Sequence, residues 1–209
     1  MNRVSRITSR FVIQCGLALL CSGFGDRPQV LADDPPEAQS PRAAYFPKVT
    51  LSTQDGKDVS FYTDLVKGKI VVINFMYTRC EGKRCGEGTK NLVKLQSALG
   101  DRLGKEVFMY SITLQPEHDT PEELKEYAKN YGAKWTFLTG KAEEITSLRG
   151  KLGLSYPDPK KEEDPRQHSG MIVVGNDSLD KWTTASILAS PDRILQIIER
   201  MKPPKAGEK

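Results

Sequence analysis

Two cysteines separated by four residues, Cys80 and Cys85, are the side chains of this sequence best suited to chemistry. They follow the apolar run at 70–77 and stand at the start of a helical pattern. The unpaired N–H groups and partial positive charge of a helix N-terminus favour a thiolate over a thiol. Lys83 and Arg84 favour the same anionic form, although they are equally well explained as solvated loop charges. The pair therefore predicts either redox exchange or the binding of a soft metal.

The other two cysteines, Cys15 and Cys21, lie in a segment that resembles a secretory signal. Its start is rich in arginine and free of acids, and an apolar stretch and the small residue Ala32 follow. We expect residues 1–32 to be a signal peptide cleaved after Ala32, with an uncleaved membrane anchor through residues 11–24 as the rival. A lipoprotein signal at Cys21 is less favoured, because Leu20 stands where a small residue is required. Cleavage would leave only the motif cysteines, in a compartment where disulfides persist.

The rest of the chain is long enough for one domain. We expect a flexible tether at 33–45, a domain at 46–202 and a disordered tail at 203–209. The chain has 31 basic and 27 acidic residues, and removing four arginines and one aspartate with the signal leaves 27 and 26. The basic character therefore belongs largely to the signal. Without a basic stripe carrying interleaved aromatics, the sequence argues against a nucleic-acid-binding protein.

Local patterns predict alternating strands and helices. Asp55-Gly56 predicts a hairpin across 49–61, and the continuous apolar run at 70–76 predicts a strand buried on both faces. Leucines at helical spacing predict a helix after Cys85. We further expect strands at 107–112, 135–138, 171–174 and around Trp182, and helices opened by Thr120-Pro121, around 145–152, and opened by Ser190-Pro191.

This order predicts an α/β protein with a thioredoxin-like fold: a mostly parallel central sheet flanked by helices, with an N-terminal β-hairpin extension. In that architecture the loop before Met171 faces the loop that carries Cys80 and Cys85, here called the thiol loop. His168 would therefore stand opposite the two cysteines. Two sulfurs and one imidazole suit Cu(I), whereas zinc would need a fourth ligand. The plainer readings are a surface histidine and a structural disulfide, although so short a closed loop adds only about 2 kcal/mol. His118 is a poorer ligand candidate, because it precedes a helix cap and should point to water.

Three stretches resemble the Sco/SenC/PrrC family: 74–80, 111–122 together with 135–140, and His168-Ser169. The resemblance extends over about 47–201. It implies an exported, thioredoxin-like protein that binds copper and serves the assembly of the copper centre of cytochrome c oxidase. It also implies that Cys80, Cys85 and His168 are the copper ligands, with Cu(I) as the ion and Cu(II) as the second option.

The chain departs from the family pattern at the thiols. Family members place three residues between the cysteines and usually a proline after each, whereas here there are four, with Glu81 and Gly86 in the proline places. Gln115 stands where the family has an acid. A disulfide needs only Cα atoms within about 7 Å. Two thiols five positions apart cannot, however, share one face of a regular helix.

Two functional classes follow. The first is an exported assembly factor, periplasmic or otherwise extracytoplasmic and either free or anchored to the inner membrane. It would hold Cu(I) and deliver copper or reducing equivalents to a cytochrome c oxidase subunit or another copper or thiol protein. The second is a thiol:disulfide oxidoreductase with Cys80 and Cys85 as catalytic residues and no stable metal. The altered spacing of the cysteines makes this second class somewhat more favoured than the family resemblance alone would suggest. A third option is a binding module that kept the fold and lost both activities.

Overall fold

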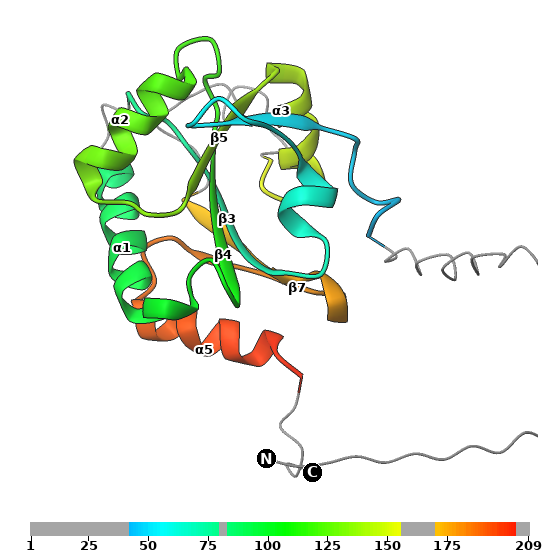
Figure 1. The fold of residues 1–209 in the computed structure, drawn as a ribbon. Helices are drawn as coiled ribbons and strands as arrows, with labels where there is room; N and C mark the ends of the chain where they lie inside the picture. Colours follow the sequence, from blue (N-terminus) through cyan, green and yellow to red (C-terminus); the bar gives the residue numbers. More distant parts are fainter. Residues whose placement is uncertain (1–41, 80–82, 156–169, 204–209) are drawn as a thin grey trace, which may run out of the picture. The chain divides into compact units, whose positions relative to one another are not determined.

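A computed structural model describes residues 42–79, 83–155 and 170–203 of the chain, with side chains in the second range described from Gly86 onward. All of these residues belong to one compact unit, Ala38–Lys209. Its centre is a seven-stranded sheet with helices on both faces (Figure 1). The strands are β1 (Thr50–Thr53), β2 (Asp58–Ser60), β3 (Ile70–Met76), β4 (Val107–Thr113), β5 (Thr136–Gly140), β6 (Met171–Asn176) and β7 (Lys181–Ser186).

The sheet is mixed, in the order β2-β1-β5-β4-β3-β6-β7. The central strands β5, β4 and β3 are parallel, and every other pair is antiparallel. The thioredoxin-like fold and the N-terminal hairpin are therefore confirmed, but the expectation of a mostly parallel sheet holds only at the centre. The flanking pairs β1–β2 and β6–β7 are joined by turns, which are too short for the crossover that parallel neighbours require.

Each face of the sheet packs against its own set of helices. One face is covered by α1 (Lys83–Leu99), α2 (Pro121–Tyr131) and α5 (Pro191–Met201), the other by the short π-helix η1 (Phe61–Val66) and by α3 (Ala142–Lys151) (Figure 1). Strand β3 supplies both cores: Val71, Ile73 and Phe75 face η1 and α3, and Val72 faces the three longer helices. This alternation explains the continuous apolar run.

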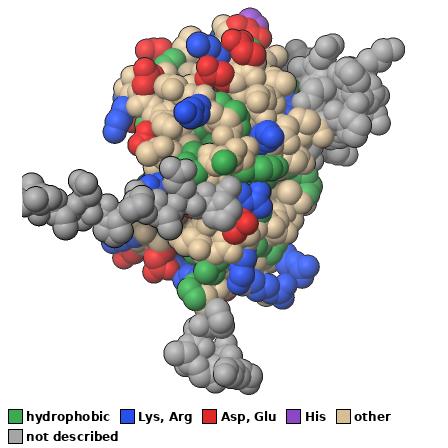
Figure 2. All heavy atoms as spheres, turned by 90° about the vertical axis from the view of Figure 1, so that its right-hand side faces the viewer, with side chains coloured by type: hydrophobic (Ala, Val, Ile, Leu, Met, Phe, Trp, Pro, Cys, Tyr) green, Lys and Arg blue, Asp and Glu red, His purple; other side chains and the backbone are tan. Residues whose placement is uncertain are grey.

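The side of the sheet that carries η1 and α3 also receives the N-terminal end of the described chain. Figure 2 views the molecule from the right-hand side of Figure 1, and hydrophobic side chains reach the surface there between basic and acidic ones. Residues 42–45, within the predicted tether, form a turn on this side of the sheet. The Tyr45 hydroxyl donates to the carbonyl of Lys151 at 2.8 Å, and the Arg42 guanidinium lies 5.5 Å from the ring centre of Trp182 and is ion-paired with Asp180.

The helix caps expected from the sequence are present. Thr120 Oγ1 accepts a hydrogen bond from the backbone N–H of Glu123, and Gly132, with φ of 68°, ends α2. Ser190 caps α5 in the same way. The helix expected after Cys85 is present as α1, but its described part reaches back to Lys83 and so already includes Cys85. Lysine and arginine are good helix formers, so the turn forms before the two glycines that follow.

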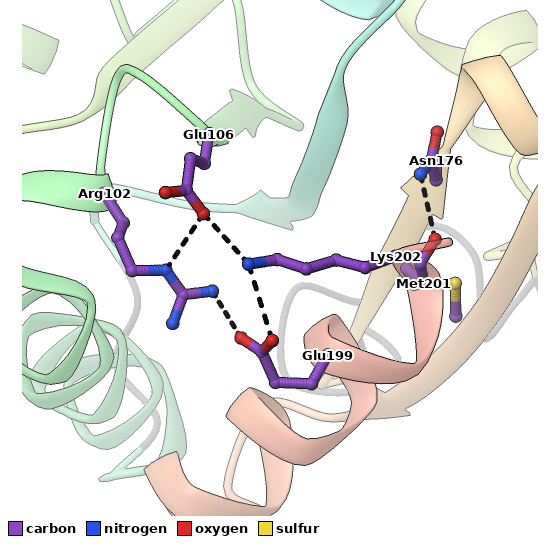
Figure 3. Close-up of polar contacts among 6 residues, drawn as sticks. All are labelled: Arg102, Glu106, Asn176, Glu199, Met201 and Lys202. Atoms are coloured by element: carbon purple, nitrogen blue, oxygen red, sulfur yellow. Dashed lines mark hydrogen bonds and ion pairs between the residues drawn. The ribbon is translucent and has the colours of Figure 1, made fainter. Parts of the chain in front are cut away.

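A ring of four charged side chains ties the end of α5 to the segment before β4 (Figure 3). Arg102 pairs with Glu106 at 3.3 Å and with Glu199, and Lys202 pairs with the same carboxylates at 2.9 and 3.4 Å. The hydrogen bond and charge of Lys202 lower the pKa of Glu106. Burial alone would raise the pKa of Glu199, but the hydrogen bonds and charges of Arg102 and Lys202 outweigh it and lower that pKa.

Glu199→Gln should therefore destabilise the fold in a pH-dependent way. A carboxylate whose folded pKa is depressed stabilises the protein above its ordinary pKa, and this contribution is lost as the pH falls through the folded value. Because the ring is largely exposed, we expect a loss of about 0.5 kcal/mol at pH 7. The loss should shrink as the pH falls below 4.5, the ordinary value for the group. Urea unfolding at several pH values measures it.

Glu126→Gln is the matched control, since Glu126 is exposed in the middle of α2 and has no ion pair among the described residues. It should leave the free energy of unfolding unchanged at every pH. An equal loss for Glu199→Gln at pH 7 and at pH 3 would show that the ring charges are not the cause.

Candidate functional site

The predicted site residues fall at the edge of the described part of the chain. Cys80 and His168 lie outside it, and Cys85 lies in the first turn of α1, where the backbone alone is described. Within 42–79, 83–155 and 170–203, no three His, Cys, Asp or Glu side chains gather as a metal site. The residues that flank the predicted ligands in the chain are described, and we call them the frame of the site. Arg79 directly precedes Cys80, and Gly170 follows His168 by two positions.

A buried carboxylate, Asp119, holds the chain just before Cys80. Asp119 has no exposed surface and accepts hydrogen bonds from the hydroxyls of Thr78 and Thr113 and, at 3.3 Å, from the backbone N–H of Thr78. Thr113 ends β4, and Thr78 follows the end of β3 by two residues. Asp119 therefore joins the carboxyl ends of two parallel strands and fixes the backbone two residues before Cys80.

Sequence analysis did not single out Asp119. The available signal was an aspartate directly before the Thr120-Pro121 cap, in the loop that follows a buried strand. Arg79 adds a second link on the same side, an exposed ion pair of 3.2 Å with Glu123 in the first turn of α2. Exposed pairs of this kind contribute little to stability, so its effect is mainly to direct the segment that enters the thiol loop.

The first turns of α1 pack tightly through two glycines. A Cβ atom on Gly86 would lie 2.9 Å from the hydroxyl of Tyr131, and one on Gly88 would lie 2.9 Å from Cδ1 of Ile187. Any larger residue at either position would force its neighbour to move. The two glycines therefore let the N-terminal end of α1 approach both α2 and the turn between β7 and α5.

Ile187 connects α1 to the start of β6. Its side chain packs on Gly88, and its backbone N–H donates to the carbonyl of Gly170 at 2.8 Å. The side-chain amide of Asn91 donates to the carbonyls of Ile187 and Ala189, both at 2.7 Å, and holds this turn against α1. Ile187 thus contacts both Gly88, three positions after Cys85, and Gly170, two positions after His168.

His118 lies in the turn before α2 and is exposed, as expected for the poorer ligand candidate. Its backbone N–H donates to the carbonyl of Gln115 at 2.9 Å, which closes the turn that carries Asp119. This hydrogen bond is made by the backbone of His118, so it accounts for the turn and gives the side chain no role as a ligand.

Comparison with known proteins identifies the family. The SCO1/SenC profile matches residues 37–202. This chain belongs to the SCO1/SenC family. The resemblance inferred from the motifs is confirmed, and the fold of the chain matches that of solved Sco proteins.

Three relatives illustrate the similarity. A protein of Stutzerimonas stutzeri, named as a candidate copper-binding protein, is 31% identical over 140 residues, which cover 66% of this chain and 67% of the relative. The crystal structure of a SCO1/SenC family lipoprotein from Bacillus anthracis covers 75% of this chain and 94% of its own at 25% identity, with a TM-score of 0.62. BsSco, described as a Sco-family cytochrome c oxidase assembly protein with a disulfide switch, covers 72% and 89% at 28% identity, with a TM-score of 0.59.

A search of the described residues finds no helix of this Sco protein that is long and apolar enough to cross a membrane. The predicted signal or anchor at 1–32 lies outside those residues.

Proposed function

We propose that this Sco-family protein binds Cu(I) through Cys80, Cys85 and His168 and delivers copper or reducing equivalents to the copper centre of cytochrome c oxidase. The observation that carries the proposal is the double contact of Ile187 with Gly88 and Gly170. Gly88 is close in sequence to Cys85, and Gly170 is close in sequence to His168. The contacts of Ile187 therefore support a position of these two ligands near each other.

Only a short length of chain separates each contact of Ile187 from the nearby predicted ligand. Cys85 and Gly88 are three residues apart in α1, a rise of about 4.5 Å. Two residues of chain span at most about 7 Å, which limits the separation between the Cα atoms of His168 and Gly170. A histidine side chain adds several more ångströms of reach, so ligation by both residues is sterically accessible.

The chemistry of the donor set also supports copper. Cu(I) prefers soft thiolate ligands, and imidazole completes a three-coordinate set. The first turn of a helix presents unpaired N–H groups, and Cys85 occupies that turn in α1. This position favours the thiolate that a copper ion requires. The Stutzerimonas stutzeri relative, named as a candidate copper-binding protein, supports the same ion.

The second candidate is a thiol:disulfide oxidoreductase that uses Cys80 and Cys85 without stable metal. The observation in its favour is the place of Cys85 within α1, near the N-terminal end of its described part, where the helix favours the thiolate of that cysteine. A thiolate stabilised in this way is a good leaving group in thiol–disulfide exchange. The disulfide switch described for BsSco is consistent with reversible oxidation of the same pair here.

We further propose that residues 1–32 direct export and are either cleaved or kept as an anchor to the inner membrane, with 33–45 as a tether, 46–202 as the Sco domain and 203–209 as a tail. A periplasmic or other extracytoplasmic location follows from this proposal. A Bacillus anthracis member of the family is described as a lipoprotein, and this description supports an exported location.

His168→Ala separates the two candidates, because a copper site needs the imidazole and dithiol exchange depends chiefly on thiolate fraction and access. We expect the variant, as the only copy in the cell, to fail in assembling the oxidase copper centre at limiting copper. Its exchange with a small disulfide should stay within about threefold of wild type. Oxidase copper content at limiting and excess copper, together with thiol exchange on purified protein, measures both. Full assembly at limiting copper would overturn copper delivery, and failed assembly with intact exchange would overturn the purely redox function.

A further inference from the structure

A cavity of about 480 Å³ opens at the end of the sheet opposite to the thiol loop. Its lining includes Lys69, directly before β3, Phe108 and Tyr110 near the start of β4, and Thr136 at the start of β5. The thiol loop follows the other end of β3, about 20 Å away for a strand of this length. The cavity is therefore a separate place on the protein, and what it binds is independent of the proposed copper function.

The wall of the cavity is fixed by hydrogen bonds. The Gln54 side chain, in the β1–β2 turn, accepts from the backbone N–H of Phe137 at 2.7 Å and donates to the carbonyl of Trp135 at 3.4 Å. This double contact holds the hairpin, which carries Lys57 and Val59, against the start of β5. The cavity thus exists before any ligand arrives, as small-molecule sites usually do.

Tyr110 lines this cavity and contributes a hydroxyl to it. Its side chain is 4% exposed, and its hydroxyl makes no hydrogen bond to the described residues. The hydroxyl is not among the fully enclosed unpaired atoms of the described residues, so the solvent that fills the cavity reaches it, and a polar atom of a ligand can take the place of that water. Burial raises the pKa of Tyr110, so the group stays protonated and can act as a donor.

The charges around the cavity favour an anion. Three lysines, Lys57, Lys69 and Lys134, line it together with one acid, Asp64. The Asp64 carboxylate already accepts from the backbone N–H of Ser60 at 2.6 Å.

The lysines divide into one that is engaged and two that are open. Lys69 donates to the backbone carbonyl of Asp64 and lies 4.7 Å from the ring centre of Phe108, and burial lowers its pKa against the opposing effect of Asp64. Lys57 and Lys134 are exposed and have no ion pair within the described residues. Two basic groups are therefore available to a ligand at the mouth.

The floor is apolar, formed by side chains of the core such as Leu65 and Phe108. We infer that this cavity binds a small organic anion with an apolar body, the anionic group near Lys57 and Lys134 and a polar atom accepting from the hydroxyl of Tyr110. The volume lies within the range of about 300–1,000 Å³ that is usual for such ligands.

The test uses 6-hydroxy-2-naphthoate as the probe, because its ring hydroxyl can accept from Tyr110 while its carboxylate lies near the lysines. Its neutral counterpart is 6-hydroxy-2-naphthalenemethanol, and both are titrated calorimetrically into the full mature protein. The two probes share the ring system and differ in charge, so the lysines should make naphthoate bind at least about tenfold more tightly. Lys57→Gln combined with Lys134→Gln should remove most of that difference. Lys94→Gln, an exposed lysine of α1 on the opposite face of the sheet, should leave it unchanged.

Tyr110→Phe tests the hydroxyl without changing the shape of the core. Removing a hydroxyl that hydrogen-bonds only to solvent should not lower the melting temperature of the free protein, whereas affinity for the naphthoate probe should fall by about three- to tenfold. The increase in melting temperature caused by saturating naphthoate should fall with it. Equal affinity for the two probes, unchanged binding in the lysine and tyrosine variants, or no saturable binding of naphthoate would each overturn the inference.

Discussion

Cys80→Ser is expected to remove Cu(I) binding, lowering the affinity by at least about a hundredfold. Serine offers a hard hydroxyl oxygen in place of a soft thiolate, and the remaining thiolate and imidazole cannot complete the three-coordinate set. His168→Ala should weaken binding less, by about tenfold, because both thiolates remain. Competition between the reduced protein and a Cu(I) chelator of known affinity gives both values, with one equivalent bound by wild type.

His118→Ala is the matched control for the histidine, because His118 is exposed and lies in a turn outside the frame set by Ile187. Its affinity for Cu(I) should equal that of wild type. A wild-type protein that fails to compete even with a weak chelator would refute the copper site, and the oxidoreductase would then be the better reading of the same two cysteines.

Asp119→Ala should lower the free energy of unfolding by about 3 kcal/mol. The substitution leaves three donors without their acceptor: the hydroxyls of Thr78 and Thr113 and the backbone N–H of Thr78. Each buried donor left unpaired costs about 1–3 kcal/mol, and some will be recovered by water entering the space. Urea unfolding measures the loss, and Glu117→Gln, two residues away and exposed, should stay within about 0.5 kcal/mol of wild type.

The same substitution should act on the thiols. Thr78 would lose its attachment to the loop after β4, so the segment entering Cys80 would move more freely, and alkylation of Cys80 in the reduced protein should become faster. If Asp119→Ala is as stable as wild type, the carboxylate does not hold the two strand ends together. If it is less stable but Cys80 reacts at the wild-type rate, the network supports the fold and not the site.

Much of the fold could be predicted because its signals are local. Asp55-Gly56 fixes the turn of the hairpin, Thr120-Pro121 and Gly132 mark the two ends of α2, and the apolar run of β3 identifies a strand with core on both sides. The pairing of β1 with β5 could not be predicted in this way. Its register, Leu51 opposite Gly140, joins residues far apart in sequence and depends on how the whole sheet assembles.

In the candidate site, too, the features with a local signal could be predicted and those that depend on distant residues could not. The thiols stand out by residue type and spacing, whereas Asp119 has a role only because Thr78 and Thr113 arrive at it from two different strands. The leucine spacing predicted a helix after Cys85, whereas α1 already includes Cys85, and the close contacts at Gly86 and Gly88 could not be read from the sequence. Cys80 and His168 lie outside the described residues, so their role as ligands stays a prediction.

The position of β1 beside β5 has a consequence for how the protein acquires its structure. The hairpin of β1 and β2 is made of neighbouring residues and can form early, but it has no sheet to join until Thr136–Gly140 has taken its place beside β4. Contacts of such long sequence separation form slowly, because the intervening chain must first be ordered. A polypeptide that emerges N-terminus first, from a ribosome or through a membrane pore, therefore keeps this flank of the sheet open until residue 140 is free.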